Sequence, residues 1–104
     1  MDINLQKWEI IISQCMPKNW KIRLRKMPKS MKSSYWAFHR TRISKEGERI
    51  VLLESTIYLN LRDAPGENKV LDEIIHELNH LCDYSIEIES KLKFTIQKLQ
   101  EEKK

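Results

Sequence analysis

Two histidines one helical turn apart, with a glutamate beside the first, are the residues of this 104-residue chain best suited to chemistry. They are His76, Glu77 and His80, in the run His-Glu-Leu-Asn-His. On an α-helix, positions i and i+4 share a face, so both imidazoles can bind one Zn²⁺ ion. Glu77 would project beside that ion, where a carboxylate can take a proton from an attacking water and deliver it to the leaving amine. The spacing predicts a zinc-dependent hydrolase, with the histidines as metal ligands and Glu77 as general base and acid.

The residues around the motif follow the pattern of a helix. Between positions 68 and 83, seven apolar residues recur at helical period and predict one buried stripe. They are Val70, Leu71, Ile74, Ile75, Leu78, Leu81 and Cys82. Asn68 is the expected N-cap of this helix. Because both histidines lie on the side opposite the stripe, we expect the helix to pack by one face and present the motif on the other.

A catalytic zinc site needs a third protein ligand, and the sequence narrows the choice. A metzincin would have glycine and histidine where this chain has Asp83 and Ile86. A deformylase-like site would use an upstream cysteine that follows a glycine, and Cys15 does not follow a glycine. Carboxylates of the segment after the motif remain. Glu89 extends the apolar stripe of a predicted second helix by one turn, where a carboxylate needs a partner such as zinc. We therefore predict Glu89 as the third ligand, with Glu87 as the alternative.

The motif, followed by a glutamate-bearing helix, resembles the gluzincin metallopeptidases. The chain is most similar to the small minigluzincins and selecases, and more distantly to SprT-like and ImmA-like peptidases, which place a β-hairpin before an H-E-x-x-H helix. SprT-like domains use a later third histidine, and no histidine follows His80 here. The distance from His80 to the next glutamate is shorter than in thermolysin-like gluzincins.

This resemblance implies a zincin-like fold, Zn²⁺ as the cofactor and a glutamate as the third ligand. It also implies endopeptidase activity of broad specificity, on peptides or unfolded proteins. Small gluzincins are sometimes held latent by their own C-terminal segment or by self-association. In this chain, autoinhibition of that kind would involve the polar tail, residues 100–104.

The elements that must position the site are predicted from periodicity. Helical patterns cover residues 2–16, 68–83 and 85–99, and alternating patterns predict strands over residues 20–25, 35–43 and 49–61. Gly47 lies in the turn between the last two strands, which we expect to form a hairpin. The expected fold is α+β. A small antiparallel sheet would pack against an N-terminal helix, the metal-bearing helix and a returning C-terminal helix.

The orientation of the strands determines what lies near the metal. We expect Trp36 and Phe38 to face the core, which would turn His39 to the solvent side as an ordinary strand residue. The strand over residues 49–61 is the expected edge beside the metal helix. Substrate could add to that edge as a further strand, through backbone hydrogen bonds. Tyr84 is interpreted as a packing residue.

Length and composition indicate a single domain over residues 1–104. With 40% hydrophobic residues, a chain of this size can bury one modest core. No apolar run reaches the length of a membrane span, and the first residues do not follow the signal-peptide pattern. Cys15 and Cys82 are expected to be free thiols. We therefore expect a cytoplasmic protein without a membrane partner.

The net charge of +4 is unevenly distributed and supports a rival hypothesis. Residues 1–49 have a balance of +8, and residues 50–104 a balance of −4. In the rival hypothesis the protein is a small basic nucleic-acid-binding protein, with an incidental or structural metal site. Cations of segment 18–32 would neutralise phosphates, and Trp20, Tyr35 and Trp36 would stack on bases. Because no helix-turn-helix, RNP or zinc-finger pattern accompanies the charge, nucleic acid is the lesser expectation.

Overall fold

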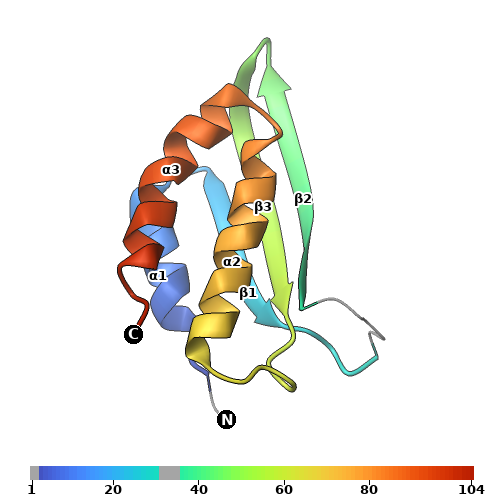
Figure 1. Ribbon diagram of the computed structural model, residues 1–104. Helices are drawn as coiled ribbons and strands as arrows, with labels where there is room; N and C mark the ends of the chain where they lie inside the picture. The colour runs from blue at the N-terminus through green and yellow to red at the C-terminus, as the bar shows by residue number, and fades with distance from the viewer. Residues whose placement is uncertain (1–2, 31–35) are drawn as a thin grey trace.

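The structure is a computed structural model that describes residues 3–30 and 36–104. In these residues, three helices lie on one side of a three-stranded sheet (Figure 1). The elements in chain order are α1 (Gln6–Cys15), β1 (Trp20–Lys26), β2 (Ala37–Glu46), β3 (Arg49–Leu59), α2 (Glu67–Cys82) and α3 (Ile86–Gln100). The predicted α+β class is confirmed.

The sheet has the strand order β1-β3-β2, so β3 is its central strand. β2 and β3 form the expected antiparallel hairpin, with Gly47 at a φ of 63° in its turn. β1, in contrast, runs parallel to β3. β1 and β2 run in opposite directions and leave one strand position between them, and β3 fills it. The prediction of a wholly antiparallel sheet is therefore wrong, as is the prediction that residues 49–61 form an edge: the edge strand that contacts α2 is β2.

Strand pairing decides which face each residue of β2 occupies. Directly paired residues of neighbouring strands lie on the same face of a sheet. His39 pairs with the buried Ile57, and Phe38 pairs with Tyr58. Phe38 stacks on Tyr58, with ring centroids 5.0 Å apart. The expected orientation of β2 is thus reversed: His39 faces the helices, and Phe38 lies on the opposite side of the sheet.

The core fills the space between the sheet and the three helices. Six of the seven residues in the predicted stripe of α2 are buried, and Cys82 is half-buried. Burying a leucine or isoleucine side chain contributes about 1.5–3 kcal/mol, so this stripe holds α2 firmly against the sheet. Neither Cys15 nor Cys82 forms a disulfide, as predicted. No helix in the described part of the chain combines the length and the apolar character needed to cross a bilayer.

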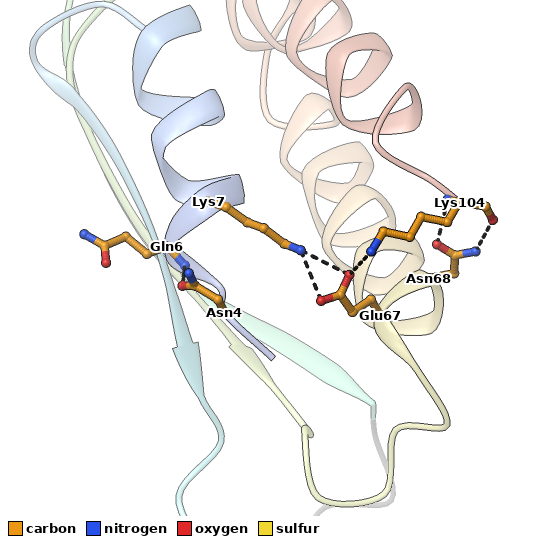
Figure 2. Close-up of polar contacts among 6 residues, drawn as sticks. All are labelled: Asn4, Gln6, Lys7, Glu67, Asn68 and Lys104. Carbon is orange, nitrogen blue, oxygen red and sulfur yellow. Dashed lines mark hydrogen bonds and ion pairs between the residues drawn. The ribbon is translucent and has the colours of Figure 1, made fainter. Parts of the chain in front are cut away.

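Both ends of the chain anchor the start of α2 (Figure 2). Lys7 Nζ of α1 donates to both carboxylate oxygens of Glu67 at 3.1 Å. Asn68 exchanges hydrogen bonds of 2.8 and 3.1 Å with the backbone of Lys104. Because α2 begins at Glu67, Asn68 lies inside its first turn and is not the N-cap that was predicted. Gly66 holds that position without a side-chain cap.

The C-terminal tail therefore packs at the N-terminal end of α2. Asn68 precedes His76 by two helical turns, about 12 Å along the axis. Lys103 reaches further, to Asp72, and forms an ion pair with it. Neither of the two pockets that contain His76 has a tail residue among its lining residues. In this structure the tail does not lie over the motif.

Candidate metal centre

α2 presents His76 and His80 on its exposed face. Their Nε2 atoms lie 2.9 Å apart, and the ring planes are nearly perpendicular at 85°. The two nitrogens thus converge on one point, as the spacing predicts. Two nitrogen ligands at 2.0–2.1 Å from a tetrahedral zinc ion would lie about 3.4 Å apart. A ring rotation that separates the nitrogens by a few tenths of an ångström would make the pair fit such an ion.

Glu77 lies beside the histidine pair and is buried, with 5% of its surface exposed. One of its carboxylate oxygens and one ring nitrogen from each histidine all lie within 4.8 Å of one another. Removing a carboxylate from water is costly unless a cation or a hydrogen bond compensates. The burial of Glu77 at this position therefore favours a site that holds a positive charge.

A third histidine reaches the site from β2. His39 Nδ1 is buried, has no hydrogen-bond partner, and lies 3.6 Å from Glu77 Oε2. His39 Nε2 lies 3.4 Å from the hydroxyl of Tyr84, which follows the end of α2. The distance between His39 Nδ1 and Glu77 Oε2 exceeds that of a hydrogen bond by a few tenths of an ångström. A small rotation of either side chain would bring the two atoms within hydrogen-bond distance. His39 and Tyr84 are thus functional candidates, although His39 was predicted to be a solvent-facing strand residue and Tyr84 a packing residue.

The sequence does contain a signal for the orientation of His39. His39 and Thr41 alternate along the strand with Arg40 and Arg42, and both arginines are exposed. Two arginines on one face of a strand favour water for that face, and so the core for the other face. On this argument Thr41 and His39 turn inward. The aromatic ring of Phe38 suggested the opposite. In the structure this ring is only half-buried, on the face away from the helices, where it stacks on the ring of Tyr58.

The motif opens into a cleft of about 590 Å³ between α2 and β2. The residues that line it are Trp36, Ala37, Phe38, His39, Glu73, His76, Glu77 and His80. Trp36 is 38% exposed, and the Lys69 ammonium lies 5.0 Å from its ring centroid. One wall is therefore largely apolar, and the other carries the titratable groups. The volume is within the range of sites that bind small molecules or short peptide segments.

Glu89, the predicted third ligand, lies in an adjoining pocket of about 440 Å³ that His76 and His80 also line. It is outside the close group that the two histidines form with Glu77 among the described residues. The Glu89 carboxylate pairs with Lys93 at 3.0 Å, and the side chain is 44% exposed. The structure thus brings Glu89 near the histidines but pairs it with an ammonium.

Glu89 does not lie on the buried stripe of α3, so the prediction that it extends this stripe is wrong. Ile88, which is 0% exposed, occupies the buried position one turn before Leu92. On a helix, i−4 as well as i−3 lies on the face of residue i, and the apolar side chain takes the core position. Glu87, the alternative ligand, accepts a hydrogen bond of 2.9 Å from the backbone N–H of Ile50 in β3. It lines a separate pocket that contains neither histidine, which leaves Glu89 as the better ligand candidate of the two.

Cys82 also lines the pocket of Glu89. Burial raises the pKa of the Cys82 thiol, and the carboxylates of Glu89 and Asp83 raise it further. The thiol consequently stays protonated near neutral pH, whereas a cysteine binds metal as the thiolate. Cys82 is therefore a half-buried packing residue at the end of the predicted stripe rather than a metal ligand.

Comparison with known proteins finds no match to this chain among family models, curated proteins or solved structures. The resemblance to gluzincins accordingly depends on the motif and the order of the elements.

Proposed function

We propose that this protein is a zinc metallopeptidase of the gluzincin type. The observation that carries the proposal is the convergence of two Nε2 atoms, 2.9 Å apart, beside a buried carboxylate at the wall of an open cleft. His76 and His80 would hold Zn²⁺, with Glu89 as the third ligand once it is released from Lys93. When bound, the ion would polarise the substrate carbonyl and lower the pKa of a water molecule.

Glu77 is the residue suited to move the proton. Its carboxylate lies within reach of the histidine nitrogens and lines the cleft, so it can accept a proton from the attacking water. The same carboxylate can then donate that proton to the amine nitrogen that leaves. His39, 3.6 Å from the Glu77 carboxylate, would hold it in orientation. The Tyr84 hydroxyl would in turn hold the His39 ring.

The substrate would bind along β2. This strand is an edge of the described sheet, and residues 36–39 line the cleft beside the motif. An extended peptide can add to such an edge through backbone hydrogen bonds, a mode that reads extension rather than sequence. We therefore infer broad specificity for peptides or unfolded proteins. Self-association through the same edge would cover the cleft and hold the enzyme latent. We infer a cytoplasmic location, in which Cys15 and Cys82 would remain thiols.

The test is an activity assay on zinc-loaded protein with a fluorogenic peptide. We expect a chelator to abolish hydrolysis, and added zinc to restore it. Glu77→Gln should retain zinc but lower kcat by at least about 100-fold, because it removes the proton acceptor. Glu48→Gln, at an exposed carboxylate in the hairpin turn, is the control and should be fully active. Full activity in Glu77→Gln, or purified protein that binds no stoichiometric zinc, would overturn the proposal.

A further inference from the structure

The side of the sheet that faces away from the helices (Figure 1) holds charged and aromatic side chains that have no role in the metal centre. We define the outer sheet face by residues that pair across the three strands and therefore share one side. They are Lys21, Arg23 and Arg25 of β1, Glu54, Thr56 and Tyr58 of β3, and Phe38, Arg40 and Arg42 of β2. This set contains five cations and one carboxylate. Arg25 forms an ion pair of 2.8 Å with Glu9 of α1, so it is not counted among the cations offered to a ligand. The carboxylate, Glu54, pairs with Arg42 at 2.8 Å.

Two arginines form the centre of the outer sheet face. Arg23 pairs with Thr56, and Thr56 pairs with Arg40, so the guanidinium groups flank the central strand. Two strand spacings, about 10 Å, separate their backbones. Both side chains are exposed, and no carboxylate of the described residues forms an ion pair with either. Their charge is therefore available to a polyanion.

An aromatic pair adjoins this arginine row. Phe38 and Tyr58 stack with ring centroids 5.0 Å apart and an angle of 20° between the ring planes. The guanidinium of Arg40 lies 5.9 Å from the Tyr58 centroid. Both rings are half-buried, so part of each is open to a ligand. Cations that follow a phosphate backbone, beside aromatic rings on which bases stack, are the combination that binds single-stranded nucleic acids.

We propose that the outer sheet face binds single-stranded nucleic acid. Lys21, Arg23, Arg40 and Arg42 contact phosphates, and the rings of Phe38 and Tyr58 take a base. An acidic peptide or an anionic lipid surface would use the cations but would leave the ring pair without a role. The cations of the outer sheet face lie on the side of the sheet opposite the histidines, and Phe38 is the one residue of the set that also lines the cleft. Binding through this face does not require the metal or the proposed peptidase activity.

This surface differs from the one that the sequence predicted. Trp20, an expected stacking residue, is 4% exposed and belongs to the core. Trp36 lies in the cleft beside the motif, and Tyr35 is outside the described residues. The aromatic residues of the outer sheet face come instead from the β2–β3 pairing, which places Phe38 against Tyr58.

The test is fluorescence anisotropy with a labelled oligouridine of about 12 nucleotides, a length within the usual site size. A chelator is present throughout, so that the metal centre does not contribute. We expect the logarithm of the affinity to fall with the logarithm of the salt concentration at a slope of about −2 to −3, because four phosphate contacts each contribute about −0.7. The double variant Arg23→Ala/Arg40→Ala should bind at least about ten-fold more weakly, with a slope smaller in magnitude by about 1.4.

The matched control is Lys91→Ala/Lys98→Ala on α3, which removes the same charge from exposed positions of the helical layer. It should retain the affinity of the unmodified protein. Tyr58→Leu should weaken binding several-fold and leave the salt slope unchanged. If the two double variants lost affinity equally, net charge alone would explain the binding, and the proposal would be overturned. Tighter binding to a duplex of equal length, to polyglutamate or to vesicles that contain phosphatidylserine would also overturn it. Circular dichroism checks that each variant is folded.

Discussion

His39 Nδ1 of β2 lies 3.6 Å from Glu77 Oε2 of α2, and the two side chains are only 17% and 7% exposed. The contact joins the edge of the sheet to the helix that carries the motif. Since Glu77 is the carboxylate that would move protons, its orientation depends on where β2 places His39. The geometry of the cleft is therefore a consequence of strand register as well as of the motif.

Replacement of His39 should separate proton transfer from metal binding. We expect His39→Ala to retain zinc but to lower kcat by about 10- to 100-fold, the usual effect of losing a residue that orients an active-site group. The pH–rate profile should shift, with little change in KM. Thr41→Ala is the control on the same face of β2, since it removes the 2.8 Å contact to Ser55 but not the neighbour of Glu77. An equal loss in both variants would indicate a structural role for His39.

Two neighbouring carboxylates should respond differently to removal. Glu89→Ala should weaken zinc binding, measured by competition with a chelating dye, because it removes the proposed third ligand. Glu87→Ala should leave zinc affinity unchanged but lower the free energy of unfolding by about 1–3 kcal/mol, because the Ile50 N–H loses its acceptor. Lys93→Ala should tighten zinc binding by releasing Glu89. Loss of zinc in Glu87→Ala alone would assign the third ligand to Glu87.

Removal of the buried hydroxyl of Thr95 should stabilise the protein. Thr95 is 0% exposed, and its Oγ1 has no hydrogen-bond partner. Thr95→Val keeps the shape of the side chain and removes an uncompensated polar atom, so we expect a gain of about 1 kcal/mol in the free energy of unfolding. The midpoint temperature of thermal unfolding should rise by about 4–8 °C. Thr95→Ser keeps the hydroxyl and loses a methyl group, and it should unfold at a lower temperature. A less stable Thr95→Val would mean that the hydroxyl has a partner.

Trimming the tail should affect stability rather than activity. The tail bonds to Asn68 and pairs with Glu67 and Asp72 at the start of α2, away from the cleft. Because these contacts are largely exposed, deletion of residues 102–104 should lower the free energy of unfolding by about 1 kcal/mol or less. Asn68→Ala should give part of the same loss. Hydrolysis should be unchanged, and a rise in activity on trimming would instead establish autoinhibition by the tail.

Acid should weaken the junction between α1 and α2. The hydrogen bond and positive charge of Lys7 lower the pKa of Glu67 below its ordinary value of 4.5. A pKa that is lower in the folded state stabilises the protein above the unfolded-state value, and this contribution disappears as the pH falls through the folded-state value. Glu67→Gln should therefore lose less stability than the unmodified protein between about pH 6 and about pH 3, measured by urea unfolding. Identical pH dependence in the two proteins would contradict this.

Features that depend on neighbours along the chain were predictable. The positions of His76, Glu77 and His80 on one helix follow from i, i+4 geometry, and the structure presents both histidines on the exposed face of α2. Strict alternation predicted β1, and Gly47 predicted the hairpin turn. These patterns are local because helix and strand periods are properties of the backbone itself.

Other features depend on which strand fills the position between β1 and β2, and only the tertiary structure decided them. Insertion of β3 makes one pairing parallel, sets His39 opposite Ile57 and so turns His39 toward Glu77. Local periodicity states that two faces alternate, but long-range pairing chooses which of them is buried. For a similar reason Ile88, and not Glu89, lies in the core. Positions i−3 and i−4 from Leu92 are nearly equivalent in the sequence pattern, and helix packing decides which of them is buried.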